Sequence, residues 1–558
     1  MTSTSGTLRQ PANRKRNNQD LGDFTTTLRV IPISGLAIVI GAVCAYVAWA
    51  LLRLIGLVTN LAYFHRWSSE LVSPATNKLG VYAILIPIVG GLIIGLMARF
   101  GTERIRGHGI PEAIEAILMN GSRVQPRVGI LKALSSAISI GTGGPFGAEG
   151  PIIMTGGSFG SVIAQFFHLT GAERKTLLVA GAAAGMSATF AAPIAAALLA
   201  VELLLFEWKP RSFIPVALAS ATAVGVRYHI LGLGPLFPVP LHPASIGFDG
   251  LLSCVLVGVL AGALSALLTV AVYGAEDLFQ HLSIHWMWWP AIGGLVIGIG
   301  GLIFPQALGV GYDTIGALLR GDVPRNIIIG VLLVKSIIWA FSLGSGTSGG
   351  VLAPLLMMGG ALGGIEARFL PHEGAGFWEL ISLGAILGGT MRSPFTGIIF
   401  AVELTHDWNA LLPLLVACTV AHGFTVLTLK RSILTEKVSR RGFHLSREYS
   451  VDPLELLFVD EVMSTDALTG GVAIVGVGQL VSYRDETLRA AVYRMAESGV
   501  TRLPVVNADR PAEVVGILTL EDLLRARVRH LEEERDRERV LHVGPRSGPG
   551  RGSADPVG

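Results

Sequence analysis

One carboxylate stands where an apolar segment begins. Glu149 lies within Gly143–Pro151, a stretch rich in glycine, and a long uncharged apolar segment follows it. A carboxylate costs roughly 2.5–3.5 kcal/mol at the centre of a membrane helix, so such a residue indicates function. Pro151 suits the first turn of a helix, where free N–H groups carry about half a positive charge. Because Gly147 and Gly150 permit a tight turn, the site could hold either the Glu149 carboxylate or a small anion in its place. This competition predicts a gate.

The composition places these residues in a membrane protein. Of 558 residues, 51% are hydrophobic and only 15% are charged, whereas soluble domains are about 25% charged. The 70 glycines indicate closely packed or interrupted helices. A net charge of +3 gives no argument for a nucleic-acid partner. The three cysteines lie in apolar runs and predict no disulfide framework.

The N-terminus predicts the orientation. Residues 1–30 form a polar tail that contains Arg14, Lys15 and Arg16, and the apolar run 31–59 is too long for a secretory signal. Basic flanks remain on the cytoplasmic side, so we expect both termini in the cytoplasm. The predicted location is the cell membrane (plasma or inner membrane), crossed several times by the chain.

The membrane region contains an internal repeat. Two halves, about 31–232 and 249–429, carry similar segments in the same order. The pairs are Gly107–Ile110 with Gly309–Tyr312 at an offset of 202, Pro151–Gly160 with Pro354–Gly363 at 203, and Pro193–Leu203 with Pro394–Leu404 at 201. Repeated halves with helices interrupted by glycine or proline predict a transport site between the repeats. The sequence leaves open whether the repeat is inverted.

The composition becomes that of a soluble domain from about residue 452. Residues 485–499 and 520–529 have helical patterns, and two short β-rich runs, 502–506 and 514–519, lie between them. Residues 457–464 predict an opening strand and helix. Residues 531–558 predict a charged helix end and a disordered tail.

Three motifs resemble those of the CLC family of chloride channels and chloride/proton antiporters. They are Gly107–Pro111, Gly147–Pro151 and Gly350–Pro354, and the resemblance covers about residues 31–445. The soluble part, 452–530, resembles a CBS domain through Gly516–Asp522. The implied fold class is an all-α polytopic membrane protein with two repeated halves of broken and tilted helices, plus a small α/β CBS domain. The family also implies a homodimer with one pore per subunit, in a lipid bilayer.

The resemblance assigns roles to single positions. Glu149 matches the gate that occupies an anion site and accepts a proton, and Lys132 matches a buried basic residue near the pore. For Lys132, a lysine that reaches the surface is the alternative. The implied anion-binding positions are His108, Gly109, Ala148, Gly150, Val351, Leu352 and Leu434.

Two of these positions depart from the family pattern. His108 replaces a common serine, and Leu434 replaces a common tyrosine. An imidazole can still donate a hydrogen bond, or it can turn toward the backbone instead. Leu434 makes the inner barrier hydrophobic. Selectivity among chloride, nitrate and other small anions therefore stays open.

A third departure concerns the inner proton position. Many antiporters of the family carry a second glutamate directly after the one that Glu202 matches, but Leu203 stands there. Channels of the family lack this glutamate, as do some members that couple protons. We interpret Glu202, like its repeat mate Glu403, as structural rather than proton-carrying.

Thr519 and Asp522 match positions that contact ribose and phosphate in nucleotide-binding CBS domains. No cofactor is required; an adenine nucleotide at the CBS domain is the one candidate, with a purely structural dimer contact as the alternative.

The predicted function is chloride/proton antiport, with a passive voltage- or pH-gated chloride channel as the alternative. A cation transporter regulated by the CBS domain is remote, because the core carboxylates Glu149, Glu202, Asp313 and Glu403 are scattered along the chain. No nucleophile–base or metal-ligand constellation predicts an enzyme or a metal site.

Overall fold

The computed structural model describes residues 26–118, 121–441, 454, 457–465 and 480–535. These residues divide into two compact units, one before and one after the gap at 442–453. The predicted N-terminal tail up to residue 25 and the tail from 536 lie outside the described residues.

The first unit is helical, and its elements follow the order of the sequence repeat. The helices of the first half are α1 (Val30–Phe64), α2 (Leu85–Phe100), α3 (Ile110–Leu118), α4 (Pro126–Gly141), α5 (Glu149–Gln165), α6 (Gly171–Phe190), α7 (Pro193–Leu199) and α8 (Pro210–Ile230). A π-helical segment, η5 (Ala200–Leu205), continues α7, and short 3₁₀ turns lie at η2 (Pro74–Thr76), η3 (Gly80–Ile84) and η4 (Glu103–Ile105).

The second half repeats this order. Its helices are α9 (Phe248–Gln280), α10 (Trp289–Ile303), α11 (Tyr312–Leu319), α12 (Arg325–Gly330), α13 (Ser336–Gly344), α14 (Leu352–Glu366), α15 (Phe377–Met391), α16 (Pro394–Thr405), α17 (Leu411–Thr428) and α18 (Ile433–Arg440). The π-helical segment η8 (Val331–Lys335) joins α12 to α13, and 3₁₀ turns lie at η6 (Trp286–Trp288), η7 (Pro305–Ala307) and η9 (Trp408–Ala410).

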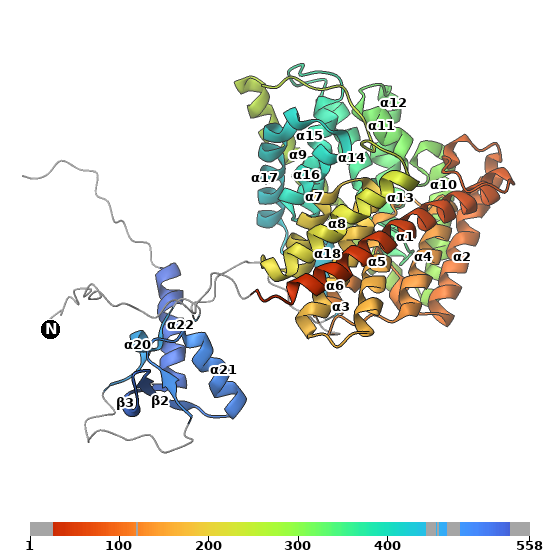
Figure 1. The fold of residues 1–558 in the computed structure, drawn as a ribbon. Helices are drawn as coiled ribbons and strands as arrows, with labels where there is room; N and C mark the ends of the chain where they lie inside the picture. The colour runs from red at the N-terminus through yellow and green to blue at the C-terminus, as the bar shows by residue number, and fades with distance from the viewer. Residues whose placement is uncertain (1–25, 119–120, 442–453, 455–456, 466–479, 536–558) are drawn as a thin grey trace, which may run out of the picture. The chain divides into compact units, whose positions relative to one another are not determined.

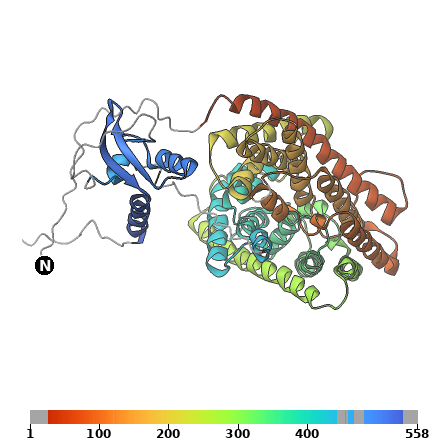
Figure 2. The ribbon, with the colours of Figure 1, turned by 90° about the horizontal axis from the view of Figure 1, so that it is seen from below.

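The packing of the helices also repeats. Helix α5 packs on α6 as α14 packs on α15, and α1 packs on α8 as α9 packs on α17. The equivalent helices α2 and α10 pack on each other, as do α7 and α16. Figure 1 shows α1 lying obliquely across its half, and Figure 2 shows several helices nearly end-on with others inclined to them. The two predicted halves are therefore interlocked.

Glycine permits the closest helix contacts at the centre of this unit. A Cβ at Gly181 of α6 would lie 3.0 Å from the Gly156 carbonyl carbon of α5. Small residues allow this approach where lipid gives helices no hydrophobic drive to associate. Most residues of both helices are buried, so the segment that begins at Glu149 lies in the core of the unit.

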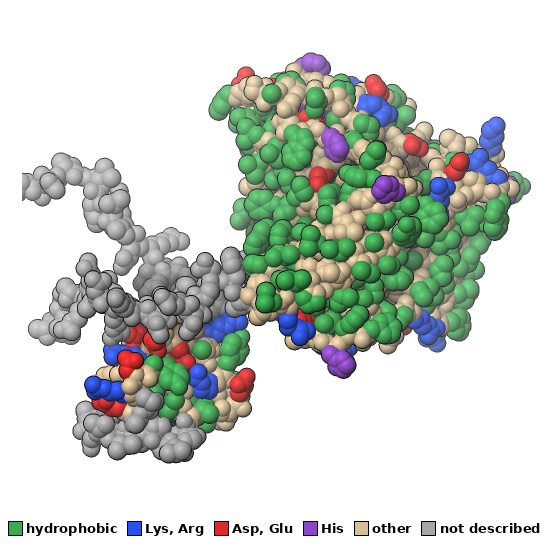
Figure 3. Space-filling model, in the orientation of Figure 1, with side chains coloured by type: hydrophobic (Ala, Val, Ile, Leu, Met, Phe, Trp, Pro, Cys, Tyr) green, Lys and Arg blue, Asp and Glu red, His purple; other side chains and the backbone are tan. Residues whose placement is uncertain are grey.

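The outer surface suits a bilayer. Among the described residues, seven helices are long and apolar enough to cross a membrane, and several others are apolar but shorter. Figure 3 shows a face covered mainly by apolar side chains, with charged side chains gathered toward two opposite edges. The prediction of a polytopic helical membrane protein is confirmed.

The second unit is a small α/β domain. Its elements are α20 (Val459–Val462), β1 (Ser482–Tyr483), α21 (Leu488–Ser498), β2 (Arg502–Asn507), β3 (Arg510–Thr519) and α22 (Leu520–Arg535). The sheet order is β1-β2-β3, with β1 parallel and β3 antiparallel to β2. The strand expected near residue 457 is reduced to isolated bridges at Phe458 and Ser464.

Candidate functional site

Two of the three glycine motifs, Gly147–Pro151 and Gly350–Pro354, cross at the centre of the membrane unit. Gly147 and Gly350 form an antiparallel bridge, in which Gly147 N donates to Gly350 O at 3.2 Å and Gly350 N to Gly147 O at 2.8 Å. Their numbers differ by 203, the offset of the repeat. Because equivalent residues pair with each other, the pseudo-symmetry axis of the two halves passes through this bridge.

The third motif reaches the same point. Gly109 has φ +87°, and a Cβ there would lie 3.0 Å from Gly150 O and 3.1 Å from Lys132 Cε. A Cβ at Gly150 would lie 3.2 Å from the Cα of Gly350. All three motifs therefore need glycine where they meet, and the starts of α3, α5 and α14 lie close together.

The Glu149 side chain lies at the start of α14, a helix of the other half. Glu149 is the first residue of α5 and is fully buried, and its Oε1 accepts a hydrogen bond from Ala353 N at 2.6 Å. Ala353 lies in the first turn of α14, where free N–H groups attract negative charge. Val351 and Leu352, the amides named from the sequence, precede it and are buried. The carboxylate thus sits in a position that suits a small anion.

The remaining predicted positions of the gate segment are also buried. Ala148 is the N-cap of α5, and Gly150 is its second residue. Neither side chain offers a polar group, so any contact they make with an anion is through the backbone. Their roles as anion ligands stay predictions.

Two buried lysines, at equivalent positions of the two halves, donate hydrogen bonds to backbone carbonyls next to the crossing. Lys132 Nζ donates to Ile105 O at 2.8 Å and to Gly107 O at 2.6 Å, and Lys335 Nζ donates to Gly309 O at 2.7 Å. Both side chains are fully buried, which excludes the surface alternative for Lys132. Lys335 is also close enough to Glu149 for their charges to interact. The sequence analysis missed Lys335, although adding the offset of 203 to Lys132 leads to it.

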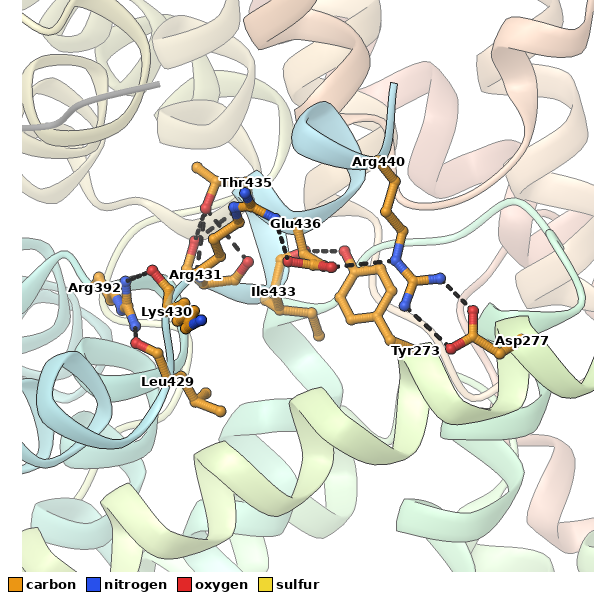
Figure 4. A network of polar contacts seen from close by, with 11 residues as sticks. Tyr273, Asp277, Arg392, Leu429, Lys430, Arg431, Ile433, Thr435, Glu436 and Arg440 are labelled. Carbon is orange, nitrogen blue, oxygen red and sulfur yellow. Dashed lines mark hydrogen bonds and ion pairs between the residues drawn. The ribbon is translucent and has the colours of Figure 1, made fainter. Parts of the chain in front are cut away.

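A cavity of about 610 Å³ beside α18 reaches Gly107 and His108 of the first glycine motif. His108 lines it, is only 4% exposed, and has a buried Nδ1 without a hydrogen-bond partner among the described residues. Leu434 is fully buried, and its neighbour Ile433 lines the cavity. A tyrosine hydroxyl lies next to this position: Tyr273 of α9 donates its O–H to Ile433 O at 2.5 Å, so this proton is not free for an anion (Figure 4). No sequence signal pointed to Tyr273.

Glu202 and Glu403 each form hydrogen bonds with the opposite half of the membrane unit. Glu202 in η5 accepts hydrogen bonds from Thr396 N at 2.9 Å and Thr396 Oγ1 at 2.6 Å, at the start of α16. Glu403 in α16 accepts from Ile194 N at 3.0 Å and Ala195 N at 2.8 Å, at the start of α7. Each carboxylate thereby caps a helix of the other half. Leu203, beside Glu202, is buried.

Thr519 and Asp522 bind each other in the small domain. Asp522 Oδ2 accepts from Thr519 N at 2.9 Å and from Thr519 Oγ1 at 2.7 Å, while Asp522 N donates to Thr519 Oγ1 at 3.2 Å. These reciprocal bonds cap the start of α22 and account for both side chains structurally. Nucleotide binding stays a prediction.

The fold and the crossing define a polytopic membrane protein with repeated halves and helix starts directed at one buried site. A family model described as voltage gated chloride channel matches residues 89–426, and a CBS domain model matches residues 459–529. The chain belongs to the voltage-gated chloride channel family, and it is a multi-pass membrane protein.

Relatives and solved structures agree with this assignment. The chain is 28% identical to a putative chloride channel protein ClcB-like of Ralstonia nicotianae, over 64% of this chain and 85% of the relative. It is 30% identical to the H(+)/Cl(-) exchange transporter ClcA of Citrobacter koseri, over 63% of this chain and 78% of the relative. The fold is similar to that of a slow cyanobacterial Cl-/H+ antiporter, with a TM-score of 0.64 and 22% identity, over 75% of this chain and 99% of that structure.

Proposed function

We propose that the protein exchanges chloride for protons across the cell membrane, with Glu149 as the gate. One observation carries the proposal: the Glu149 carboxylate accepts the Ala353 N–H at the start of α14. An anion and this carboxylate compete for one site, because both are stabilised by the same helix start. The similarity to exchange transporters supports chloride as the anion.

The mechanism follows from this competition. While Glu149 is deprotonated, its carboxylate holds the helix start and blocks the path. Protonation neutralises the carboxylate and weakens its attraction to the Ala353 N–H, so that an anion can take its place. Departure of the anion lets the side chain return and release the proton. One residue therefore links the two ions.

A passive chloride channel is the second candidate. It is favoured by Leu203, which is buried and cannot carry a proton, and by Glu202, whose carboxylate caps α16. On the cavity side, the buried carboxylate of Glu112 is ion-paired with Lys437 at 2.8 Å. Because Leu203 stands where many antiporters of the family carry an inner glutamate, protons that reach Glu149 from this side need another route.

The proposal is tested with Glu149→Ala in liposomes, with chloride and pH recorded together. We expect chloride flux to persist or rise while proton movement stops. Glu403→Gln is the matched control, because the Glu403 carboxylate is also buried and also caps a helix start, that of α7. This variant should retain proton movement. Loss of chloride flux in folded Glu149→Ala protein, or unchanged proton movement, would refute the gate.

The assembly and orientation belong to the same proposal. We expect a homodimer with a pore in each subunit and with both termini in the cytoplasm, so that the cavity beside α18 faces the cytoplasm. The basic residues of the N-terminal tail support this orientation. Light scattering of the purified protein tests the dimer, and labelling of a cysteine placed in the tail of intact cells tests the orientation.

A further inference from the structure

The second half carries a hydroxyl where the first half carries an apolar side chain. The repeat pairs Ile110 with Tyr312, which are the first residues of α3 and α11. Ile110 is fully buried and offers no polar group. The hydroxyl oxygen of Tyr312 is also buried, and it has no hydrogen-bond partner among the described residues. Because an unpaired buried hydroxyl is costly, a group that pairs with it in another state of the protein would be stabilised there.

The repeat also places the start of α11 beside the group that binds Glu149. In the first half, the start of α3 meets the start of α5, since a Cβ at Gly109 would lie 3.0 Å from Gly150 O. The equivalent residues of the second half are Gly311, which precedes α11, and Ala353, in the first turn of α14. Ala353 N donates the hydrogen bond that Glu149 accepts.

The contacts of the second half agree with this placement. Helix α11 packs on α14, and a Cβ at Gly311 would lie 3.0 Å from Met357 Sδ of α14 and 3.8 Å from Lys335 Nζ. Tyr312 and Glu149 are close enough to interact electrostatically, as are Lys335 and Glu149. The hydroxyl and the carboxylate therefore lie in one neighbourhood, without a hydrogen bond between them.

The ring of Tyr312 is fixed by its neighbours. Its centre lies 5.9 Å from that of Phe237, in an edge-to-face arrangement. Phe237 is only 4% exposed, and its N donates to Leu404 O at 2.9 Å. The hydroxyl is thus presented at a fixed place, and the Glu149 side chain is the part that would move toward it.

Arg227 adds a positive charge beside Tyr312. It lies in the last turn of α8, is only 6% exposed, and donates from Nη1 to Gly232 O at 3.0 Å. In the part of the chain that the structure describes, no carboxylate forms an ion pair with Arg227, while Arg227 and Tyr312 interact electrostatically. Helix α8 begins beside the start of α1, where Arg211 and Arg29 line one pocket. Arg227 therefore lies on the membrane side opposite the N-terminal tail, where its charge attracts a carboxylate that moves outward.

We propose that the Tyr312 hydroxyl receives the carboxyl group of Glu149 when this group leaves the start of α14, and that it holds the gate open while an anion occupies the vacated place. The proposal rests on the proposed function, because it names the group that stabilises the open gate. A protonated carboxyl group can donate its O–H to the tyrosine oxygen or accept the tyrosine O–H. Tyr312 acts through Glu149 and is a positioning residue.

Chloride binding tests the proposal without transport. Glu149→Gln carries a neutral side chain that can accept the tyrosine O–H, as the protonated gate does. Adding Tyr312→Phe to Glu149→Gln should raise the Kd for chloride about tenfold in calorimetric titration of the purified protein, because the amide is no longer held away from the place of the anion. Adding Tyr312→Phe to Glu149→Ala should leave the Kd unchanged, since no gate side chain remains to be held.

The comparison of the two backgrounds excludes a merely structural role. An equal rise of the Kd in both would mean that the hydroxyl contacts the anion or supports the fold, and it would overturn the proposal. An unchanged Kd in folded Glu149→Gln/Tyr312→Phe protein would overturn it as well. Tyr228→Phe is the matched control, because Tyr228 is an exposed tyrosine at the end of α8, and it should leave the Kd of Glu149→Gln unchanged.

Chloride flux in liposomes separates this proposal from the proposed function. Tyr312→Phe alone should lower the coupled flux about tenfold, because the open gate is less populated, and leave the number of chloride ions per proton unchanged. Wild-type protein that moves chloride without protons would refute the proposed exchange, while a Kd that depends on Tyr312 in Glu149→Gln but not in Glu149→Ala would still support the held gate. Full coupled flux in Tyr312→Phe protein would refute the role of Tyr312 alone.

Discussion

In the proposed mechanism Glu149 competes with the anion for the start of α14, so removal of its carboxylate should strengthen anion binding there. The perturbation is Glu149→Ala, compared with the wild type and with Glu149→Gln. In the wild type, Glu149 Oε1 lies 2.6 Å from Ala353 N and is fully buried. An anion can enter only after this contact has been broken. The substitution removes that cost.

The size of the effect follows from the contact. A hydrogen bond to a charged group contributes about 1.5–3 kcal/mol, and a charge at a helix N-terminus adds about 0.3–2 kcal/mol. The carboxylate therefore opposes an anion by roughly 2–5 kcal/mol. At about 1.4 kcal/mol for each factor of ten, anion affinity at this site should rise roughly thirtyfold to a few thousandfold in Glu149→Ala.

Isothermal titration of the purified protein with chloride measures this affinity. Glu149→Gln should lie between the wild type and Glu149→Ala, since the neutral amide still fills the space but binds the Ala353 N–H less strongly. Glu403→Gln, which alters a similar carboxylate away from the crossing, should titrate as the wild type does. The reasoning is refuted if Glu149→Ala binds chloride with wild-type affinity and stoichiometry.

Three further predictions concern the cap made by Glu403, the buried Lys335 and the CBS domain. Glu403→Ala should lower stability by about 2–6 kcal/mol, because two hydrogen bonds to its carboxylate are lost, and Glu403→Gln by less; equal thermal midpoints in detergent would exclude the capping role. Lys335→Met should cost about 1–3 kcal/mol by leaving Gly309 O unpaired, whereas an unchanged midpoint would contradict this support. If the CBS domain binds an adenine nucleotide, ATP at 100 times its Kd should stabilise it by about 2.7 kcal/mol, and Thr519→Val should abolish that shift; the absence of a shift at any ATP concentration would leave only the structural role.

The sequence predicted the gate and the repeat because both are local patterns. Glu149 was identified by its charge, its glycines and the proline of its helix start. The offset of 203 correctly anticipated that Gly147 and Gly350 occupy equivalent places. The family resemblance is confirmed by the match to residues 89–426.

What the sequence could not predict depends on contacts between distant segments. Tyr273 reaches Ile433 across 160 residues, and no pattern in α9 distinguishes this tyrosine from a lipid-facing one. The caps made by Glu202 and Glu403 require that each half's helix start face the other half, which spacing alone does not determine.

The central claim is that chloride and protons are exchanged through one gate, and the most direct measurement is proton movement driven by chloride alone. Liposomes that contain the wild-type protein are given an outward chloride gradient and no pH gradient, with the membrane potential clamped by potassium and valinomycin. The account predicts that protons move inward as chloride leaves, so that a pH gradient builds up against no initial driving force. Chloride efflux at a constant internal pH would contradict it and identify a passive channel.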